Sequence, residues 1–250
     1  MKVLVINGSP RGEQSSTMHL TRAFLEGAGW QNAEIIDLTE QKIEHCMGCF
    51  ACWFHTPGSC VINDSMSELL PKLIAADVVV WSFPLYYYNI PGKLKSFIDR
   101  NLPLVSPEMS EESEIGDHPD RYDLSSQRNI LISGCGFWTA KGNYPSIEAM
   151  FDLIWAEGRY GDNKYEKIFV GQGSLLSLPT QKIPPEVLAV TPDAHEIQAK
   201  VAAYLDVVRT AGSQWADGKI DDATRRQLEQ SIMTKEAYEK SANQNASQIQ

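Results

Sequence analysis

Four cysteines are gathered in the stretch HCMGCFACWFHTPGSC, which covers residues 45–60. Cys46, Cys49, Cys52 and Cys60 are separated by two, two and seven residues. Four thiolates are the ligand set that a four-iron cluster requires. Free cysteine is also among the side chains most often buried as a small hydrophobic group. Spacing therefore leaves two interpretations open, a cluster or simple packing, and disfavours zinc because two separate Cys-x-x-Cys pairs are not evident.

Hydroxyl groups are concentrated in a second stretch, NGSPRGEQSST at residues 7–17. Hydroxyls and backbone N–H groups at the start of a helix form a receptor for phosphate, and an arginine can add a charged contact. The glycine pattern is neither Gly-x-Gly-x-x-Gly nor a Walker loop, which disfavours dinucleotides and nucleoside triphosphates. A monophosphate fits better, and the alternative is a polar turn with a Ser/Thr helix cap. The candidate phosphate ligands are Ser9, Arg11, Ser15, Ser16 and Thr17.

Two further loops have residues suited to a flat ligand. PLYYYNIPG at residues 84–92 holds three consecutive tyrosines, whose hydroxyls need polar partners and so favour a position beside a planar ring. In SGCGFWTAKGNYPS at residues 133–146, Gly134 and Gly136 allow the backbone to approach a ligand closely. Taken singly, each loop also fits an aromatic plug or an ordinary turn. Together, the three loops favour a planar ring system that carries one phosphate, namely FMN.

The elements that must position these loops alternate between strands and helices. Short apolar runs predict strands, and apolar residues at helical spacing predict helices between them. A helix is also expected to begin at Asp64 or Ser65, with Ser65 and Glu68 at capping-box spacing and Pro71 shortening or kinking it. The remaining expected elements are strands at 2–7, 33–38, 77–83, 129–137 and 165–173, and helices at 16–27, 91–102, 146–158 and 193–216.

This alternation predicts an α/β fold, a flavodoxin-like doubly wound parallel sheet with helices on both faces. Five strands suit the order 2-1-3-4-5, in which ligands bind at the carboxyl ends of the strands. We expect an FMN-binding domain at residues 1–218, interrupted by an acidic insertion at about 105–128 that is a lid, a subunit contact or a solvated loop. Residues 219–250 are expected to form a C-terminal extension, helical to about Lys240 and ending in a tail.

Composition narrows the class of partner. The formal net charge of −10, without a dense Lys/Arg patch, argues against nucleic acid. No apolar run approaches the roughly 18–20 residues that span a bilayer, and no signal peptide is recognisable, so we expect no membrane contact and a cytoplasmic location. Neither a Ser-His-Asp order nor a Gly-x-Ser-x-Gly elbow indicates a hydrolase. A small-molecule ligand is the expectation that remains.

Residues 1–175 resemble the flavodoxin-like NAD(P)H-dependent FMN reductases, a group that includes quinone reductases and iron–sulfur flavoproteins. The segments NGSPRGEQSST, CMGCFACWFHTPGSCVINDSM and PLYYYNIPGKLKSFIDR support this resemblance. It implies a non-covalent FMN that takes hydride from NAD(P)H and passes electrons to a quinone-like acceptor. It also implies a homodimer or homotetramer. By position, the resemblance assigns Ser9, Arg11, Ser16 and Thr17 to the phosphate, Pro84, Leu85, Tyr86, Tyr87 and Asn89 to the ring, and Ser133, Gly134 and Gly136 to the rest of the site.

Three functional hypotheses follow. The first is an FMN oxidoreductase in which Tyr86 or Tyr87 protonates the reduced acceptor and the four cysteines bind no metal. The second is an electron carrier in which Cys46, Cys49, Cys52 and Cys60 hold an iron–sulfur cluster. The third is a non-catalytic FMN-binding module. Among these we favour the first, and we assign the remaining cysteine, Cys135, to packing near the ring.

Overall fold

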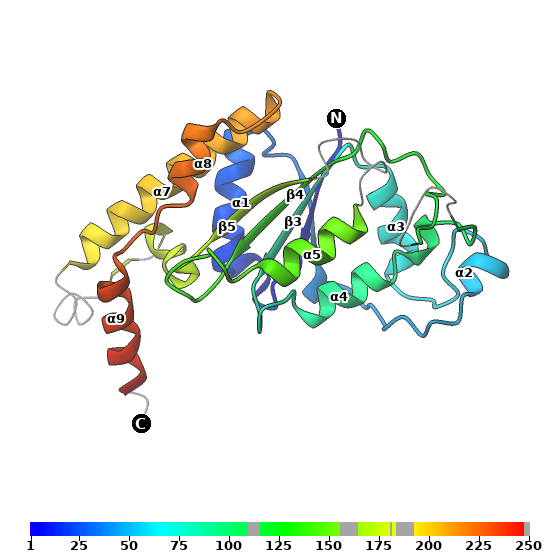
Figure 1. The fold of residues 1–250 in the computed structure, drawn as a ribbon, viewed down its shortest axis with the longest axis horizontal. Coiled ribbons are helices and arrows are strands. Elements are labelled where there is room, and N and C mark those ends of the chain that lie inside the picture. The colour runs from blue at the N-terminus through cyan, green and yellow to red at the C-terminus, as the bar shows by residue number, and fades with distance from the viewer. Residues whose placement is uncertain (110–115, 156–164, 181, 184–192, 248–250) are drawn as a thin grey trace.

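The computed structural model describes residues 1–109, 116–155, 165–180, 182–183 and 193–247. Within these ranges the central sheet has five parallel strands in the order β2-β1-β3-β4-β5 (Figure 1). The predicted doubly wound sheet and its strand order are therefore confirmed. The strands are β1 (Val3–Asn7), β2 (Glu34–Asp37), β3 (Val78–Pro84), β4 (Arg128–Gly134) and β5 (Glu166–Val170).

The central strands are apolar because both of their faces are covered. In β1, Leu4 and Ile6 contribute to the hydrophobic cluster on one face, whereas Val5 lies in the cluster on the other. Val80 of β3 pairs with Val5 on one side and with Ile130 of β4 on the other, and all three are fully buried. Such continuous apolar runs are typical of parallel strands buried between helical layers.

The two helical layers are visible in Figure 1. Three helices cover one face: α3 (Met66–Ile74), α4 (Gly92–Asp99) and α5 (Pro145–Ile154). The opposite face is covered by α1 (Ser16–Gly27) and α7 (Ala194–Ala216). No helix in the described part of the chain is both long and apolar enough to span a membrane.

The remaining described elements are shorter or lie outside these layers. Helix α2 (Ala51–Phe54) lies in the cysteine segment at the end of the molecule farthest from α7 (Figure 1). After α7 follow α8 (Asp222–Leu228), which lies beside it, and α9 (Lys235–Ser247), which extends past the sheet and continues seven residues beyond the expected end at Lys240. Short 3₁₀ turns lie at Gly12–Gln14, Leu38–Glu40, Leu102–Leu104, Gly173–Leu175 and Leu178–Thr180.

The predicted capping box at the start of α3 does not form. Ser65 has helical dihedral angles and its side chain caps no N–H of α3, because its Oγ accepts a hydrogen bond from the N–H of Lys42 instead. The Oδ1 atom of Asp64 accepts from the N–H of Met66. Helix α3 runs through Pro71 and ends three residues later. The start of α3 is therefore tied to a distant segment rather than to its own first turn.

The described part of the acidic insertion folds back on the body. Val105 and Asp120 form an antiparallel bridge, and the N–H of Ser106 donates to the carbonyl of Pro119 at 2.8 Å. The ring of His118 lies 4.7 Å from the ring of Trp53 in α2. Among the described residues, the base of the insertion thus contacts the cysteine segment rather than extending into solvent.

Candidate functional site

A cavity of about 160 Å³ lies at the carboxyl edge of the sheet, where four of the strands end. The loops that follow β1, β3, β4 and β5 all contribute to its wall, as expected at the edge where a doubly wound sheet binds its ligands. The lining residues are Ser9, Arg11, Ser15, Ser16, Thr17, Pro84, Leu85, Tyr86, Gly134, Cys135, Gly136, Gly173 and Ser174.

One end of the cavity is formed by the loop after β1 and the start of α1. Ser15 caps α1: its Oγ accepts a hydrogen bond of 3.2 Å from the N–H of Met18 and keeps its own proton for another acceptor. The first N–H groups of a helix have no partner within the helix and carry partial positive charge. The first turn of α1 has no acidic side chain, and Arg11 adds a positive charge. This end of the cavity is therefore suited to an anion.

Two glycines shape the opposite wall. A Cβ atom placed on Gly136 would meet no atom within 4 Å. A Cβ atom on Gly134 would be in ordinary contact with its neighbours, 3.6 Å from Cδ1 of Leu176, 3.7 Å from Cα of Gly173 and 3.8 Å from Oγ1 of Thr17. Larger side chains at these positions would extend into the space, so the glycines keep it open for the flat face of a ligand. The donor-rich end and the open wall together fit a phosphate attached to a planar ring, the shape of FMN.

The tyrosine-rich loop is a tight turn. Tyr86 and Asn89 exchange both backbone hydrogen bonds, at 2.8 and 3.0 Å. The two central residues, Tyr87 and Tyr88, have φ values of +49° and +63°. Two consecutive left-handed residues are typical of a type I′ turn, which favours Asn and Gly, so the tyrosines hold a strained backbone.

This turn directs the three tyrosines differently. Tyr86 lines the cavity and is 46% exposed, whereas Tyr87 is 98% exposed and does not line it. The ring of Tyr88 stacks on Phe137, with ring centres 5.5 Å apart. The Oδ1 atom of Asn89 accepts from the N–H of Ile90, so the amide supports the turn. Of the predicted catalytic pair, the structure brings Tyr86 alone to the cavity wall.

Ser133, a predicted cofactor ligand, does not reach the cavity either. It is fully buried, and its Oγ lies 3.1 Å from Oη of Tyr144. Burial, with a smaller contribution from the neighbouring Cys135, raises the pKa of Tyr144 well above its ordinary value. Burial likewise raises the pKa of Cys135. The phenol and the thiol are both protonated at neutral pH, so this wall of the site carries no negative charge.

The structure therefore brings together most of the predicted cofactor residues. Tyr87, Asn89 and Ser133 lie outside the lining. Three lining residues were not predicted as ligands, namely Cys135, Gly173 and Ser174. The last two follow β5, so the rule that ligands bind at strand ends could have found them. Cys135 had been assigned to packing near the ring, and its thiol donates to the carbonyl of Thr139 at 3.6 Å.

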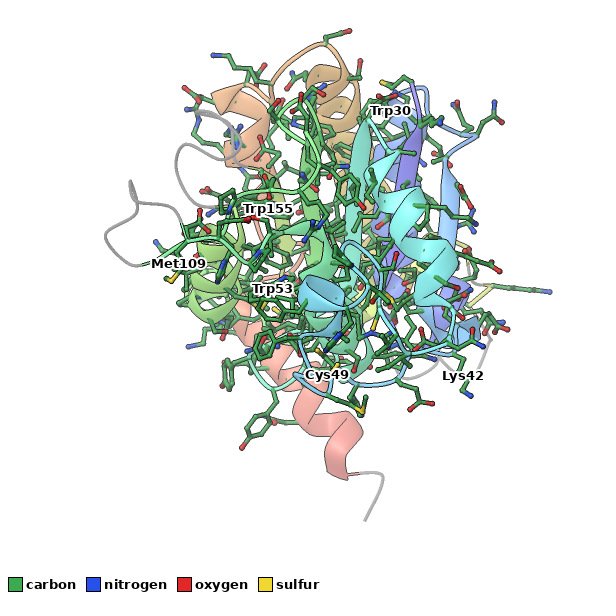
Figure 2. The ribbon with its side chains drawn as sticks, turned by 90° about the vertical axis from the view of Figure 1, so that its right-hand side faces the viewer. Trp30, Lys42, Cys49, Trp53, Met109 and Trp155 are labelled. Carbon is green, nitrogen blue, oxygen red and sulfur yellow. The ribbon has the colours of Figure 1, made fainter. Side chains whose placement is uncertain are left out.

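The four clustered cysteines lie away from this cavity, in the segment that contains α2. Figure 2 shows Cys49 and Trp53 together on this segment. Cys46 and Cys49 are exposed, Cys52 is buried, and all five cysteines of the chain are free thiols. Burial, followed by the neighbouring thiols of Cys60, Cys46 and Cys49, raises the pKa of Cys52. The thiols are thus neighbours, yet no three His, Cys, Asp or Glu side chains among the described residues are placed to hold a metal ion. As arranged here, the cysteines do not fit a cluster.

A buried ion pair closes the base of the cysteine segment. Both nitrogens of the Arg100 guanidinium end donate to the carboxylate of Asp64, at 2.7 and 3.0 Å, and Nη1 also donates to the carbonyl of Glu44. The two side chains are 1% and 0% exposed. Burial alone would raise the pKa of Asp64, but hydrogen bonds from Arg100 and from two backbone N–H groups outweigh it and lower that pKa. The pair joins Glu44, two residues before Cys46, to Asp64, four residues after Cys60.

Known proteins resemble this chain in sequence and in fold. A family model described as a flavodoxin-like fold matches residues 1–103. An iron–sulfur flavoprotein of Archaeoglobus fulgidus is 37% identical over 105 residues, which make up 41% of this chain and 46% of that protein. The chain spans between 46% and 60% of the length of the iron–sulfur flavoproteins that it matches.

Two further similarities extend over most of the chain. The NAD(P)H:quinone oxidoreductase structure from Methanothermobacter marburgensis superposes with a TM-score of 0.55 at 15% identity, over 86% of this chain and 96% of the other, and supports the fold. The FMN-dependent NADH:quinone oxidoreductase of Ralstonia nicotianae is 32% identical over 228 residues, covering 84% of this chain and 99% of the relative. Because that match includes nearly the whole relative, the chain belongs to the flavodoxin-like family of FMN-dependent NADH:quinone oxidoreductases.

Proposed function

We propose that this protein is an FMN-dependent oxidoreductase that takes hydride from NADH or NADPH and passes electrons to a quinone or similar small acceptor. The observation that carries the proposal is the cavity at the carboxyl edge of the sheet, where the donor-rich start of α1 and the glycines of the β4 loop face the same space. Family membership supports the same cofactor.

The phosphate of FMN would bind at the start of α1. Ser9, Arg11 and the run Ser15–Thr17 supply hydroxyls, backbone N–H groups and one guanidinium to this end of the cavity. The net charge of −10 does not oppose this assignment, because the local field at the helix start is positive. Charge-assisted hydrogen bonds from these groups would hold the phosphate and fix the register of the ring.

The ring would lie between the β3 and β4 loops. Pro84, Leu85 and Tyr86 line one part of this space, and Gly134 and Gly136, from the neighbouring strand end, line another. When bound, FMN supplies the hydride chemistry, and the protein supplies orientation and a partly dry surface. Tyr86 is the proposed proton donor to the acceptor, since its side chain lines the cavity and remains partly exposed.

The remaining predicted residues have supporting parts in this proposal. Asn89 holds the turn that presents Tyr86, and Ser133 supports the β4 loop through Tyr144. Tyr87, Tyr88 and Phe137 expose aromatic surface beside the cavity. Such exposed aromatic surface favours a homodimer or homotetramer in which a neighbouring chain covers it. The five free cysteines favour a location in the cytoplasm, where thiols stay reduced. Analytical ultracentrifugation would measure the number of chains.

An absorption spectrum tests the main proposal. Purified protein, or protein incubated with FMN and freed of excess, is expected to show a bound flavin spectrum that anaerobic NADH or NADPH bleaches. Addition of a soluble quinone should then restore the absorbance. Failure to retain FMN would overturn the proposal. Tight FMN binding without reduction by either nicotinamide would instead identify a non-catalytic FMN-binding module.

A second candidate function is an iron–sulfur flavoprotein that carries electrons between protein partners. One observation favours it: Cys52 lies close enough to Cys46, Cys49 and Cys60 for their charges to affect its pKa. A cluster would require these thiols to converge further than they do here. About four iron and four acid-labile sulfide atoms per chain, lost in Cys52→Ser, would support this function. Iron-free protein that remains reducible by NAD(P)H would exclude it.

A further inference from the structure

The loop after β5 contains a buried glutamine whose side chain binds the C-terminal extension. Gln172 is fully buried and has a left-handed backbone, with φ of +56°. Its Nε2 donates to the carbonyl of Met233, and its Oε1 accepts from the N–H of Met233, both at 2.9 Å. One amide side chain thus satisfies both backbone groups of a residue 61 positions away.

A second contact joins the same extension to the β4 loop. Oη of Tyr238, in α9, donates to the carbonyl of Gly136 at 2.8 Å. Ser231 adds a longer hydrogen bond of 3.4 Å from its Oγ to the carbonyl of Trp138. Gly136 lines the cavity described above, and so do Gly173 and Ser174, which follow Gln172. The hydrogen bonds from Tyr238 and Met233 therefore end on a wall residue and on the residue that precedes one.

The two loops are also bonded to each other. The N–H of Gln172 donates to the carbonyl of Phe137 at 2.6 Å, and the N–H of Gly173 donates to the carbonyl of Cys135 at 2.7 Å. The two loops therefore form one hydrogen-bonded unit. On the outer side of this unit, the segment Ser231–Tyr238 supplies the hydrogen bonds to Gln172, Gly136 and Trp138.

Helix α9 has little else to hold it in place. From Lys235 to Asn243, Tyr238 is the one half-buried residue, and the others are exposed. Figure 1 shows α9 extending beyond the carboxyl edge of the sheet, away from both helical layers. A polar helix with so little buried surface gains no stability from packing of an apolar face, so the Tyr238 hydroxyl is its main described anchor.

We infer that the segment Ser231–Tyr238 is the outer wall of the FMN site, and that Tyr238 is a positioning residue that fixes the β4 loop against the ring. The inference rests on the proposed function and adds an element distant in sequence to the binding site. Neither Tyr238 nor Gln172 lines the cavity. Tyr238 acts through the backbone of Gly136, which lines it, and Gln172 directly precedes the lining residue Gly173.

FMN titration of the full-length apoprotein, followed by flavin fluorescence, tests this inference. Tyr238→Phe removes one hydroxyl from a half-buried side chain, so we expect the apoprotein to fold and unfold as wild type does. Loss of one hydrogen bond to the loop is expected to raise the Kd for FMN by about three- to tenfold. Gln172→Leu removes two further hydrogen bonds and should raise the Kd at least as much.

Tyr204→Phe is the matched control, because Oη of Tyr204 also donates to a backbone carbonyl, that of Leu228 at 2.7 Å, and neither residue lines the cavity. It should lower the unfolding midpoint and leave the Kd for FMN unchanged. Tyr238→Phe with a wild-type Kd would overturn the inference, as would equal weakening by Tyr204→Phe. Wild-type protein that fails to bind FMN would refute the proposed function instead, so the two failures are distinguishable.

Discussion

The individual residues that matter most for binding and for stability lie in two places, the cavity wall and the base of the cysteine segment. At the wall, our proposal requires glycine at position 136, because FMN would occupy the open space beside its backbone. At the base, Arg100 and Asp64 are tolerated in the interior because they form two hydrogen bonds with each other and further ones with the backbone of Glu44 and Met66, although Nε of Arg100 has no partner among the described residues. Each feature leads to a prediction about one residue.

Replacing Gly136 with leucine should abolish FMN binding without unfolding the protein. The new side chain would meet no protein atom within 4 Å of its Cβ and would extend into the cavity. We expect at least a hundredfold loss of FMN affinity, about 2.7 kcal/mol. Gly92→Leu is the control, since Gly92 also has open space around it and does not line the cavity. Unchanged binding in Gly136→Leu would show that the ligand lies elsewhere.

Asp64→Asn should strongly destabilise the fold. The substitution leaves the buried Arg100 guanidinium without its anionic partner, a change that typically costs about 3–5 kcal/mol in unfolding free energy. Urea denaturation at pH 7 would measure it. The control is Glu34→Gln, which breaks the surface pair with Lys72 and should cost less than about 1 kcal/mol. Similar costs for the two variants would contradict the role assigned to the buried pair.

The same pair predicts how stability depends on pH. The pKa of Asp64 is lowered in the folded protein relative to the unfolded chain, where an aspartate titrates near about 3.9. Its stabilising contribution is therefore complete above about pH 4 and is lost as the pH falls through the folded pKa. The difference in unfolding free energy between wild type and Asp64→Asn should narrow below about pH 4. A difference that stays constant between pH 7 and pH 3 would exclude this linkage.

At the scale of elements, the position of α1 matters most, because its first turn supplies the donor-rich end of the cavity, where we propose that the phosphate binds. The helix is held against the sheet by α7, and the two helices approach backbone to backbone. A Cβ atom on Gly212 of α7 would lie 2.1 Å from the carbonyl oxygen of Phe24, and one on Gly27 of α1 would lie 1.9 Å from that of Arg209. Neither glycine can carry a side chain unless the helices separate.

Gly212→Ala should therefore destabilise the protein, by about 3 kcal/mol or slightly more if the helices cannot separate freely. The clash is with backbone, which no rotamer change relieves. Thermal unfolding followed by circular dichroism would measure the loss, and Gly92→Ala, where the added methyl meets no atom within 4 Å, should not lower the midpoint. Wild-type stability in Gly212→Ala would mean that α1 and α7 are farther apart than described.

At the scale of the whole molecule, the parallel sheet gathers into one cavity loops that are distant in sequence. Ser9, Pro84, Gly134 and Gly173 lie at the carboxyl ends of four different strands or just after them, yet all line the same space. The C-terminal extension reaches this space from the outside through Tyr238. A ligand in the cavity would therefore contact residues from four strand ends at once and stabilise the molecule as a unit.

FMN should accordingly raise the unfolding temperature of the apoprotein. A ligand present at a hundred times its Kd adds about 2.7 kcal/mol to the unfolding free energy. For a chain of this size, that corresponds to an increase of about 5–11 °C in Tm. Differential scanning fluorimetry at several FMN concentrations would measure the increase. An unchanged Tm for wild type, or an equal increase for Gly136→Leu, would contradict binding in this cavity.

Much of the fold follows from local patterns in the sequence. The apolar runs predict the five strands to within three residues at each end, and the helix expected at Ser16–Gly27 has those bounds. The phosphate loop was recognisable because its hydroxyls follow a strand and precede a helix, so neighbouring residues form one end of the site. The capping box predicted at Ser65 was wrong because a distant segment competes for the same hydroxyl. Its Oγ accepts a hydrogen bond from the N–H of Lys42 and none from its own helix.

The sequence by itself determined the extents of the strands, the position of the cavity at their carboxyl ends and its donor-rich loop, because periodicity and loop composition are local properties. Tertiary structure alone decided which side chains reach that cavity. The left-handed turn directs Tyr87 outward, and the hydrogen bond to Tyr144 keeps Ser133 in the core. Tyr238, distant in sequence, does not line the cavity but donates a hydrogen bond to the carbonyl of Gly136, which does. Side-chain direction depends on backbone angles and long-range contacts, and spacing along the sequence does not specify them.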